Sequence, residues 1–203
     1  MSSHNALPKL PDISIVDTIT QEYVNNLSLV LQQLNHQDIK SFTRALMSMR
    51  KRSGTLYICG NGGSAANAIH LANDFTFGIC PSGDALKVEA LSANSSVLTC
   101  LGNDIGYENI FSHQLKVKAS EKDILLVLSG SGNSSNIINA IEQAKHLKMM
   151  TVGILGYSGG GAKPRLDLPF HFNIDDMQVS EDMQVILGHI LMQSLHQLIL
   201  QES

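Results

Sequence analysis

Two glycine- and serine-rich loops constrain the fold of this chain more than any other feature of its sequence. Each loop follows a short apolar run and precedes a segment with helical periodicity, in TLYICGNGGSAANAIHLANDF at residues 55–75 and in DILLVLSGSGNSSNIINAI at residues 123–141. A strand that enters a helix through such a loop directs free backbone N–H groups and the positive end of the helix dipole into one small volume. The sequence therefore predicts two strand–loop–helix units that bind a phosphate group.

The composition of the loops narrows the class of ligand. The second loop, residues 129–135, has four serine hydroxyls and a carboxamide but no lysine or arginine. Neither loop contains the GxGxxG pattern of dinucleotide sites or the GxxxxGK[ST] pattern of triphosphate sites. A sugar phosphate therefore fits better than ATP or NAD. The alternative is that both loops are ordinary β–α turns in which glycine and serine only cap helices, and the repetition of the pattern favours binding.

The composition sets outer limits on the class of protein. The chain has 203 residues, of which 43% are hydrophobic and 16% charged, enough to bury the core of one domain. A net charge of −4 and the absence of a long basic run argue against direct nucleic-acid binding. The N-terminus lacks a signal-peptide pattern, and no apolar run reaches the ~20 residues that a bilayer requires. We expect a cytoplasmic protein without a membrane segment.

Hydrophobic periodicity predicts an α/β fold. Residues 1–11 should form a loose arm, and residues 12–53 should form two helices. The first of these helices carries a long apolar stripe, which could pack either against its own domain or in a bundle between subunits. Residues 54–203 should form the α/β core. Five strands are expected, at residues 55–59, 86–91, 124–129, 151–155 and 168–173. Helices are expected at about 64–77, 95–101, 107–118, 134–148 and 178–200. This alternation predicts a single domain, a three-layer α/β/α sandwich with a five-stranded parallel sheet and ligands at the carboxyl ends of the strands.

A third glycine-rich loop, residues 156–161, follows the fourth expected strand. It could either wrap a ligand or serve as a flexible connection, and we favour the connection.

Two pairs of potential metal ligands or acid–base groups lie on helices. His70 and Asp74 are four residues apart and share one helix face below the first loop. Glu181 and His189 are eight residues apart on the last helix, close enough to face one cavity. Two imidazoles and two carboxylates can form a metal site or share proton transfers. Spacing alone leaves open whether the two helices meet, and each residue taken singly suits a structural role.

Four segments carry a resemblance to a known family. They are GNGGSAANAIHLANDF, LGNDIGYENIF at residues 101–111, SGSGNSSNIINAIEQAKHLKM, and EDMQVILGHIL near the end of the chain. Together they resemble the sugar isomerase (SIS) domain family, and within it the phosphoheptose isomerase branch. The resemblance covers essentially the whole chain. It implies a flavodoxin-like SIS fold and a homotetramer with N-terminal helices in a central bundle and active sites at subunit interfaces.

The resemblance also implies an activity. Enzymes of this branch interconvert sedoheptulose 7-phosphate and D-glycero-D-manno-heptose 7-phosphate, through a cis-enediol, for surface polysaccharide such as lipopolysaccharide or capsule. Zinc, or another divalent metal, would be bound by His70, Asp74, Glu181 and His189, and Asp74 and His189 would transfer the protons. The residues implied for substrate binding are Asn61, Gly62, Gly63, Ser64, Asp104, Ser129, Ser131, Asn133 and Ser134.

Two of these positions depart from the family pattern. Asp74 stands where the family has glutamate, and Glu181 stands where it has glutamine; residues 75–85 also lack the arginine that the family tends to place there. A carboxylate displaced by ~1 Å can cost two orders of magnitude in rate. Two alternatives therefore stay open: a SIS isomerase for a different sugar phosphate, and a non-catalytic SIS adaptor that binds the replication initiator protein.

Overall fold

A computed structural model describes residues 12–202 of the chain. It contains a five-stranded, all-parallel sheet with the strand order β2-β1-β3-β4-β5. The strands are β1 (Thr55–Gly60), β2 (Lys87–Ala90), β3 (Ile124–Ser129), β4 (Met150–Leu155) and β5 (Leu168–His171). The predicted α/β fold is confirmed, and all five strands lie where hydrophobic runs predicted them. The expected loose arm, residues 1–11, lies outside the described residues.

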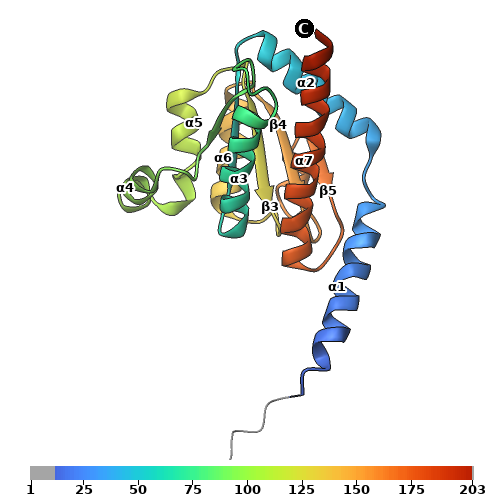
Figure 1. Cartoon of the computed structure of the whole chain (residues 1–203). Coiled ribbons are helices and arrows are strands. Elements are labelled where there is room, and N and C mark those ends of the chain that lie inside the picture. Colours follow the sequence, from blue (N-terminus) through green and yellow to red (C-terminus); the bar gives the residue numbers. More distant parts are fainter. Residues whose placement is uncertain (1–11, 203) are drawn as a thin grey trace, which may run out of the picture.

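The helices cover both faces of the sheet (Figure 1). They are α1 (Ile15–Leu31), α2 (His36–Lys51), α3 (Gly63–Asn73), α4 (Ser95–Ile105), α5 (Ser112–Lys118), α6 (Ser135–His146) and α7 (Met177–Glu202). A π-helical segment, Asp74–Gly78, continues α3, and short 3₁₀ segments lie at Tyr107–Asn109 and Lys163–Arg165. The helix expected at residues 107–118 is in fact a 3₁₀ turn followed by α5. The turn follows Gly106, whose φ of 89° ends α4.

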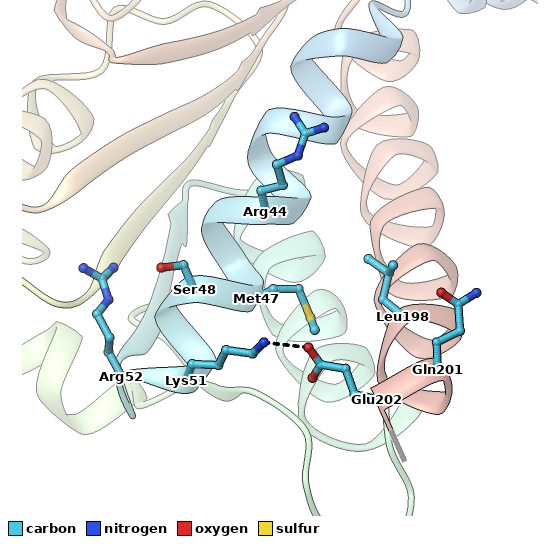
Figure 2. A pocket seen from close by; sticks show the side chains of 8 residues that line it. All are labelled: Arg44, Met47, Ser48, Lys51, Arg52, Leu198, Gln201 and Glu202. Carbon is cyan, nitrogen blue, oxygen red and sulfur yellow. Dashed lines mark ion pairs between the residues drawn. The ribbon is translucent and has the colours of Figure 1, made fainter.

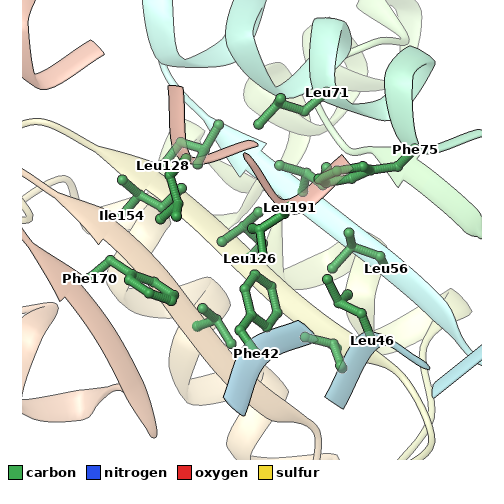
Figure 3. Packing of buried hydrophobic residues seen from close by; sticks show 14 of the residues in the cluster. Phe42, Leu46, Leu56, Leu71, Phe75, Leu126, Leu128, Ile154, Phe170 and Leu191 are labelled. Carbon is green, nitrogen blue, oxygen red and sulfur yellow. The ribbon is translucent and has the colours of Figure 1, made fainter. Parts of the chain in front are cut away.

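Strand residues alternate between two hydrophobic clusters, one on each face of the sheet. Leu56 and Ile58 of β1 pack with α2, α3 and α7, whereas Tyr57 and Cys59 pack with α5 and α6. This alternation follows from the two-residue period of a strand. Figure 3 shows the first cluster, in which Phe42 of α2 and Phe75 of the π-helical segment are fully buried. The sheet and its two helical layers therefore form the three-layer sandwich that the sequence predicted.

The first and last helices differ in how much of their apolar surface is buried. Helix α1 extends away from the sheet (Figure 1) and exposes more than half of several apolar side chains, among them Ile15, Ile19 and Leu29. Helix α7 is long and apolar enough to cross a membrane by length and composition alone. Its side chains Met183, Leu187, Leu191 and Leu195, however, are fully buried against the sheet. Helix α7 is thus a core helix of one face of the sheet rather than a membrane anchor.

Candidate active site

The loops after β1 and β3 meet at one edge of the sheet. The two strands are parallel neighbours, with Gly60 opposite Leu128, so their carboxyl ends lie side by side. Between the loops lies a small cavity of about 100 Å³. It is lined by Asn61, Ser64, Leu128, Ser129, Gly130, Ser131, Ser134, Met177 and Glu181. We call this cavity the serine cradle. Its lining has four hydroxyls and no cationic side chain.

The positive end of α3 faces this cradle. Gly62, with a φ of 56°, allows the chain to turn sharply into the helix. Gly60 permits close packing of this turn, since a Cβ there would lie 2.7 Å from the backbone of Ser64. The N–H groups of Gly63 and Ser64, at the start of the helix, donate no hydrogen bond within the described residues. Such free donors are the usual ligands of an anion at a helix N-terminus.

Neighbouring polar groups orient the cradle hydroxyls. The buried hydroxyl of Ser64 accepts a hydrogen bond of 2.9 Å from the Gln184 amide, and Gln184 in turn accepts one of 3.0 Å from Asn67. Ser129 Oγ accepts a hydrogen bond of 3.0 Å from the N–H of Gly132. Ser134 is the N-cap of α6, but its side chain forms no capping bond. Both Ser64 and Ser129 therefore keep a hydroxyl proton to donate, as a phosphate oxygen requires.

A pair of asparagines joins the two loops. Asn61 donates to Asn136 over 2.8 Å, and Asn136 donates back to Asn61 over 2.9 Å. The Tyr107 hydroxyl adds a third bond, of 2.9 Å, to Asn61. Asn136 is 1% exposed. The side chain of Asn61, expected to contact substrate, thus also holds the first loop to α6, and its partners Asn136 and Tyr107 were not among the expected site residues.

The third glycine-rich loop packs against the second. The N–H of Ala162 bonds to the carbonyl of Gly132, and the N–H of Gly161 bonds to Asn133 Oδ1, both over 2.9 Å. Gly132 has a φ of 65°, and a Cβ there would lie 2.1 Å from the carbonyl oxygen of Gly159. None of residues 156–161 lines the serine cradle. The amide oxygen of Asn133, another expected substrate contact, is already used by this packing.

A second cluster lies farther along α3. His70 Nε2 is 2.9 Å from His189 Nε2, and Asp74 Oδ2 lies 3.4 Å from His70 Nε2 and 3.3 Å from His189 Nε2. The two imidazole rings meet edge to face. Both histidines are partly exposed, with 47% and 42% of their side chains accessible, whereas the Asp74 side chain is 17% exposed. The cluster therefore opens to solvent while its carboxylate is sheltered.

The donor atoms of this cluster are spaced closely enough to share one metal ion. Donor atoms bound at about 2.0–2.1 Å around a tetrahedral ion stand roughly 3.3–3.4 Å apart. Two of the three separations here, 3.3 and 3.4 Å, have that length, and the third, 2.9 Å, is slightly shorter. Three protein ligands would match the number that catalytic zinc sites use. His70, Asp74 and His189 thus form a possible metal site.

Close contact between α3 and α7 forms this cluster. Gly188 lies against Leu71, and a Cβ at Gly188 would come within 2.2 Å of Leu71 Cδ2. His189, which follows Gly188, therefore faces His70, which precedes Leu71. Asp74 is the first residue of the π-helical segment, whose wider turn is common at functional sites. The short Asp74 side chain still reaches both imidazoles.

Glu181, the fourth expected metal ligand, does not join this cluster. Eight residues along a helix correspond to about 12 Å, so Glu181 and His189 occupy different levels of α7. The Glu181 carboxylate lies in the serine cradle instead, where a Cβ at Gly63 would be 2.3 Å from its Oε2. The expectation that Glu181 and His189 face one cavity is therefore not met in this conformation. Asp182, the next residue, accepts a 2.5 Å hydrogen bond from Tyr23 of α1. Burial, with this bond, raises the pKa of Tyr23 to about 12.

Asp104 lies on α4, outside both the cradle and the cluster. Its carboxylate accepts hydrogen bonds from the Asn103 amide at 2.7 Å and from the Cys100 thiol at 3.5 Å. The bond from Cys100 raises the pKa of that thiol. The structure thus brings Asn61, Ser64, Ser129, Ser131 and Ser134 together, but it does not bring Asp104 to them.

A larger cavity lies at the C-terminal end of α7. Figure 2 shows this groove of about 510 Å³, between α2 and the end of α7, where Lys51 pairs with Glu202 over 2.7 Å. Met47 and Leu198 supply its apolar walls, and none of the residues that line it belongs to the cradle or the cluster. Its size alone does not make it the active site, because the polar groups that could act on a substrate converge elsewhere.

The parallel sheet, the serine cradle and the histidine–aspartate cluster define a class of protein: α/β domains with a polar site at the carboxyl ends of the strands. Residues 22–156 match the model of the SIS domain family. The fold is also that of the phosphoheptose isomerase from Francisella tularensis, with a TM-score of 0.84 and 26% identity over 91% of this chain and all of that one. The phosphoheptose isomerase from Neisseria gonorrhoeae matches with a TM-score of 0.81 and 26% identity, over 89% of this chain and 96% of that one.

Sequence similarity narrows the class. The chain is 34% identical to the phosphoheptose isomerase of Helicobacter pylori strain P12 over 87% of its length and 93% of that protein. It is 32% identical to phosphoheptose isomerase 1 of Campylobacter jejuni over 88% of its length and 97% of that protein. The chain belongs to the phosphoheptose isomerase family of SIS-domain proteins.

Proposed function

We propose that this protein interconverts sedoheptulose 7-phosphate and D-glycero-D-manno-heptose 7-phosphate. Family membership gives the reaction class, an aldose–ketose isomerisation. The observation that carries the proposal is the meeting of His70, Asp74 and His189 within hydrogen-bonding and metal-binding range. A protein that had lost catalysis and kept only an adaptor role would have no need to maintain this arrangement. The pathway we propose is the cytoplasmic synthesis of heptose for surface polysaccharide.

The spacing of the two sites supports a long sugar phosphate. Ser64 and His70 are six residues apart on α3, which corresponds to roughly 9 Å along the helix. An extended seven-carbon sugar whose phosphate occupies the serine cradle would place its first two carbons near the cluster. Ser64, Ser131 and Ser134, with the free N–H groups of the first loop, would hold the phosphate. This anchoring fixes the reacting carbons, so that binding energy from the distant phosphate assists catalysis.

The cluster residues would move the protons. Asp74 is sheltered and can take the proton from the carbon next to the carbonyl, while His189, 3.3 Å away, can donate to and accept from the sugar oxygens. Removal of the proton gives a cis-enediol intermediate, and return of the proton to the neighbouring carbon completes the isomerisation. His70, Asp74 and His189 would hold zinc or another divalent ion, which when bound supplies positive charge that stabilises the developing enediolate. Glu181 remains a further candidate ligand by family resemblance.

A homotetramer is part of this proposal. The apolar side chains that α1 exposes on several sides suit a central helical bundle. Active sites at the subunit interfaces would then explain why both histidines are partly exposed in a single chain, because a neighbouring subunit would complete the walls.

The proposal is tested by proton exchange. Purified protein is incubated with sedoheptulose 7-phosphate in D₂O, with and without a chelator, and the sugar is followed by NMR. We expect deuterated aldose from the wild type, and a loss of at least about 100-fold in Asp74→Asn and His189→Gln, the range for removal of a general acid or base. Glu121→Gln, an exposed carboxylate outside the site, is the control with unchanged activity. Absence of both product and deuterium with this and related ketose phosphates would refute the isomerase and leave the adaptor role.

A further inference from the structure

The Glu181 carboxylate is an unpaired anion inside the serine cradle. It lines the cavity together with Ser64, Ser131 and Ser134. Both of its oxygens lie against the first residue of α3, 2.3 and 2.5 Å from the position of a Cβ at Gly63. Within residues 12–202 its side chain takes part in no ion pair or hydrogen bond. No lysine or arginine lines the cavity to offset its charge.

Helix electrostatics explain this position. The free N–H groups of Gly63 and Ser64 carry the positive end of the α3 dipole, and a carboxylate is stabilised near such an end. Helix α7 fixes the backbone of Glu181 from the other side, where its carbonyl accepts a 3.0 Å bond from Asn67 of α3. Helices α3 and α7 lie side by side in Figure 1. The chain thus places its own anion at the point where an external anion would bind.

We propose that Glu181 is an internal competitor for the phosphate site, a residue that sets how tightly this protein holds phosphate. The inference rests on the proposed function only in assigning the cradle to a phosphate. A phosphate dianion that enters meets a negative charge with no cation to compensate it, and like charges a few ångströms apart repel even in a water-like dielectric. Either the carboxylate leaves the cradle or the phosphate binds weakly. In both cases Glu181 lowers affinity, which favours release of both sugar phosphates in a reversible reaction.

The test is a direct measurement of phosphate binding. Inorganic phosphate is titrated calorimetrically into wild-type protein and into Glu181→Gln as purified, and the titrations are repeated after treatment with a chelator to separate the charge of Glu181 from any effect of a bound metal. The amide has the same shape as the carboxylate without its charge. We expect the dissociation constant to fall by about tenfold in Glu181→Gln. The gain should shrink at high salt, because added ions screen charges that are partly exposed.

The neighbouring carboxylate supplies a matched control. Asp182→Asn removes the same charge one residue away, from a side chain that Tyr23 holds outside the cradle. It should leave phosphate affinity unchanged within twofold. An equal affinity in wild type and Glu181→Gln, or an equal gain in Asp182→Asn, would overturn the inference. If no variant binds phosphate, the cradle is not a phosphate site and the inference also fails. The proton-exchange experiment decides independently whether the protein is an isomerase.

Discussion

At the scale of single residues, the site depends on amides as much as on charged groups. Asn61 and Asn136 exchange two hydrogen bonds between the first loop and α6, and Gln184 orients the hydroxyl of Ser64. A buried amide is costly unless its bonding capacity is satisfied. No buried side-chain nitrogen or oxygen lacks a partner within the described residues. The amides that shape the cradle therefore have their hydrogen-bonding partners before any ligand arrives.

The hydrogen bonds between Asn61 and Asn136 should contribute to both stability and substrate binding. Asn136→Ala should lower the free energy of unfolding by about 1–3 kcal/mol, because a buried partner of Asn61 is removed. It should also raise KM for the sugar phosphate more than it lowers kcat, since the loops that hold the phosphate lose their connection while the distant cluster is untouched. Chemical denaturation and steady-state kinetics measure the two effects. Lys145→Ala, at an exposed position of the same helix α6, is the control that should leave both unchanged.

At the scale of secondary-structure elements, the contact between α3 and α7 decides the chemistry. Helix α3 carries Ser64, His70 and the start of the π-helical segment at Asp74, and α7 carries Glu181 and His189. The two helices approach closely because Gly188 has no side chain where Leu71 packs. One pair of helices therefore contributes to both the phosphate cradle and the histidine–aspartate cluster.

Gly188→Ala should separate these helices. The added methyl group meets a fully buried leucine, and overpacking of this kind costs about 1–3 kcal/mol in the free energy of unfolding. The displacement should also reduce kcat, because it moves His189 relative to His70 and Asp74. Gly102→Ala in α4 is the matched control: outside its own stretch of helix no atom lies within 4 Å of its Cβ position, so it should be neutral or slightly stabilising. Unchanged stability and rate in Gly188→Ala would show that the helices can adjust.

At the scale of the whole molecule, the exposed apolar side chains of α1 are the feature that a single chain does not explain. Ile15 and Ile19 are 57% and 56% exposed. The helix is tied to the core at Tyr23, through the bond to Asp182. Its opposite surfaces are left for other subunits, which agrees with the tetramer that we propose.

Light scattering after gel filtration tests this arrangement. The wild type should have four times the 22.0 kDa mass of one chain. Ile15→Asp combined with Ile19→Asp should reduce the mass to that of a dimer or monomer, because charges would be buried in the bundle. Val117→Asp, at a 70% exposed position of α5, is the control that should remain tetrameric. A wild type that is monomeric, or a double variant that keeps the full mass, would contradict the proposal.

The order of the elements, the parallel sheet and the two loops could be predicted from the sequence alone. These features depend on local properties: hydrophobic runs, helical periodicity, and glycine where the chain turns sharply. Because the ends of neighbouring parallel strands meet at one sheet edge, the gathering of Ser64, Ser129 and Ser131 also followed from local sequence.

Which distant side chains meet could not be predicted in the same way, because it depends on how whole helices pack. Spacing along α7 places Glu181 and His189 relative to their own helix axis, but it contains no information on how α7 crosses α3. The packing of Gly188 on Leu71 sets that crossing, so His189 reaches His70 and Asp74 while Glu181 reaches the cradle. The asparagine pair was equally hidden, since Asn61 and Asn136 are 75 residues apart. Contacts of this kind arise from the packing of whole helices, which no local pattern encodes.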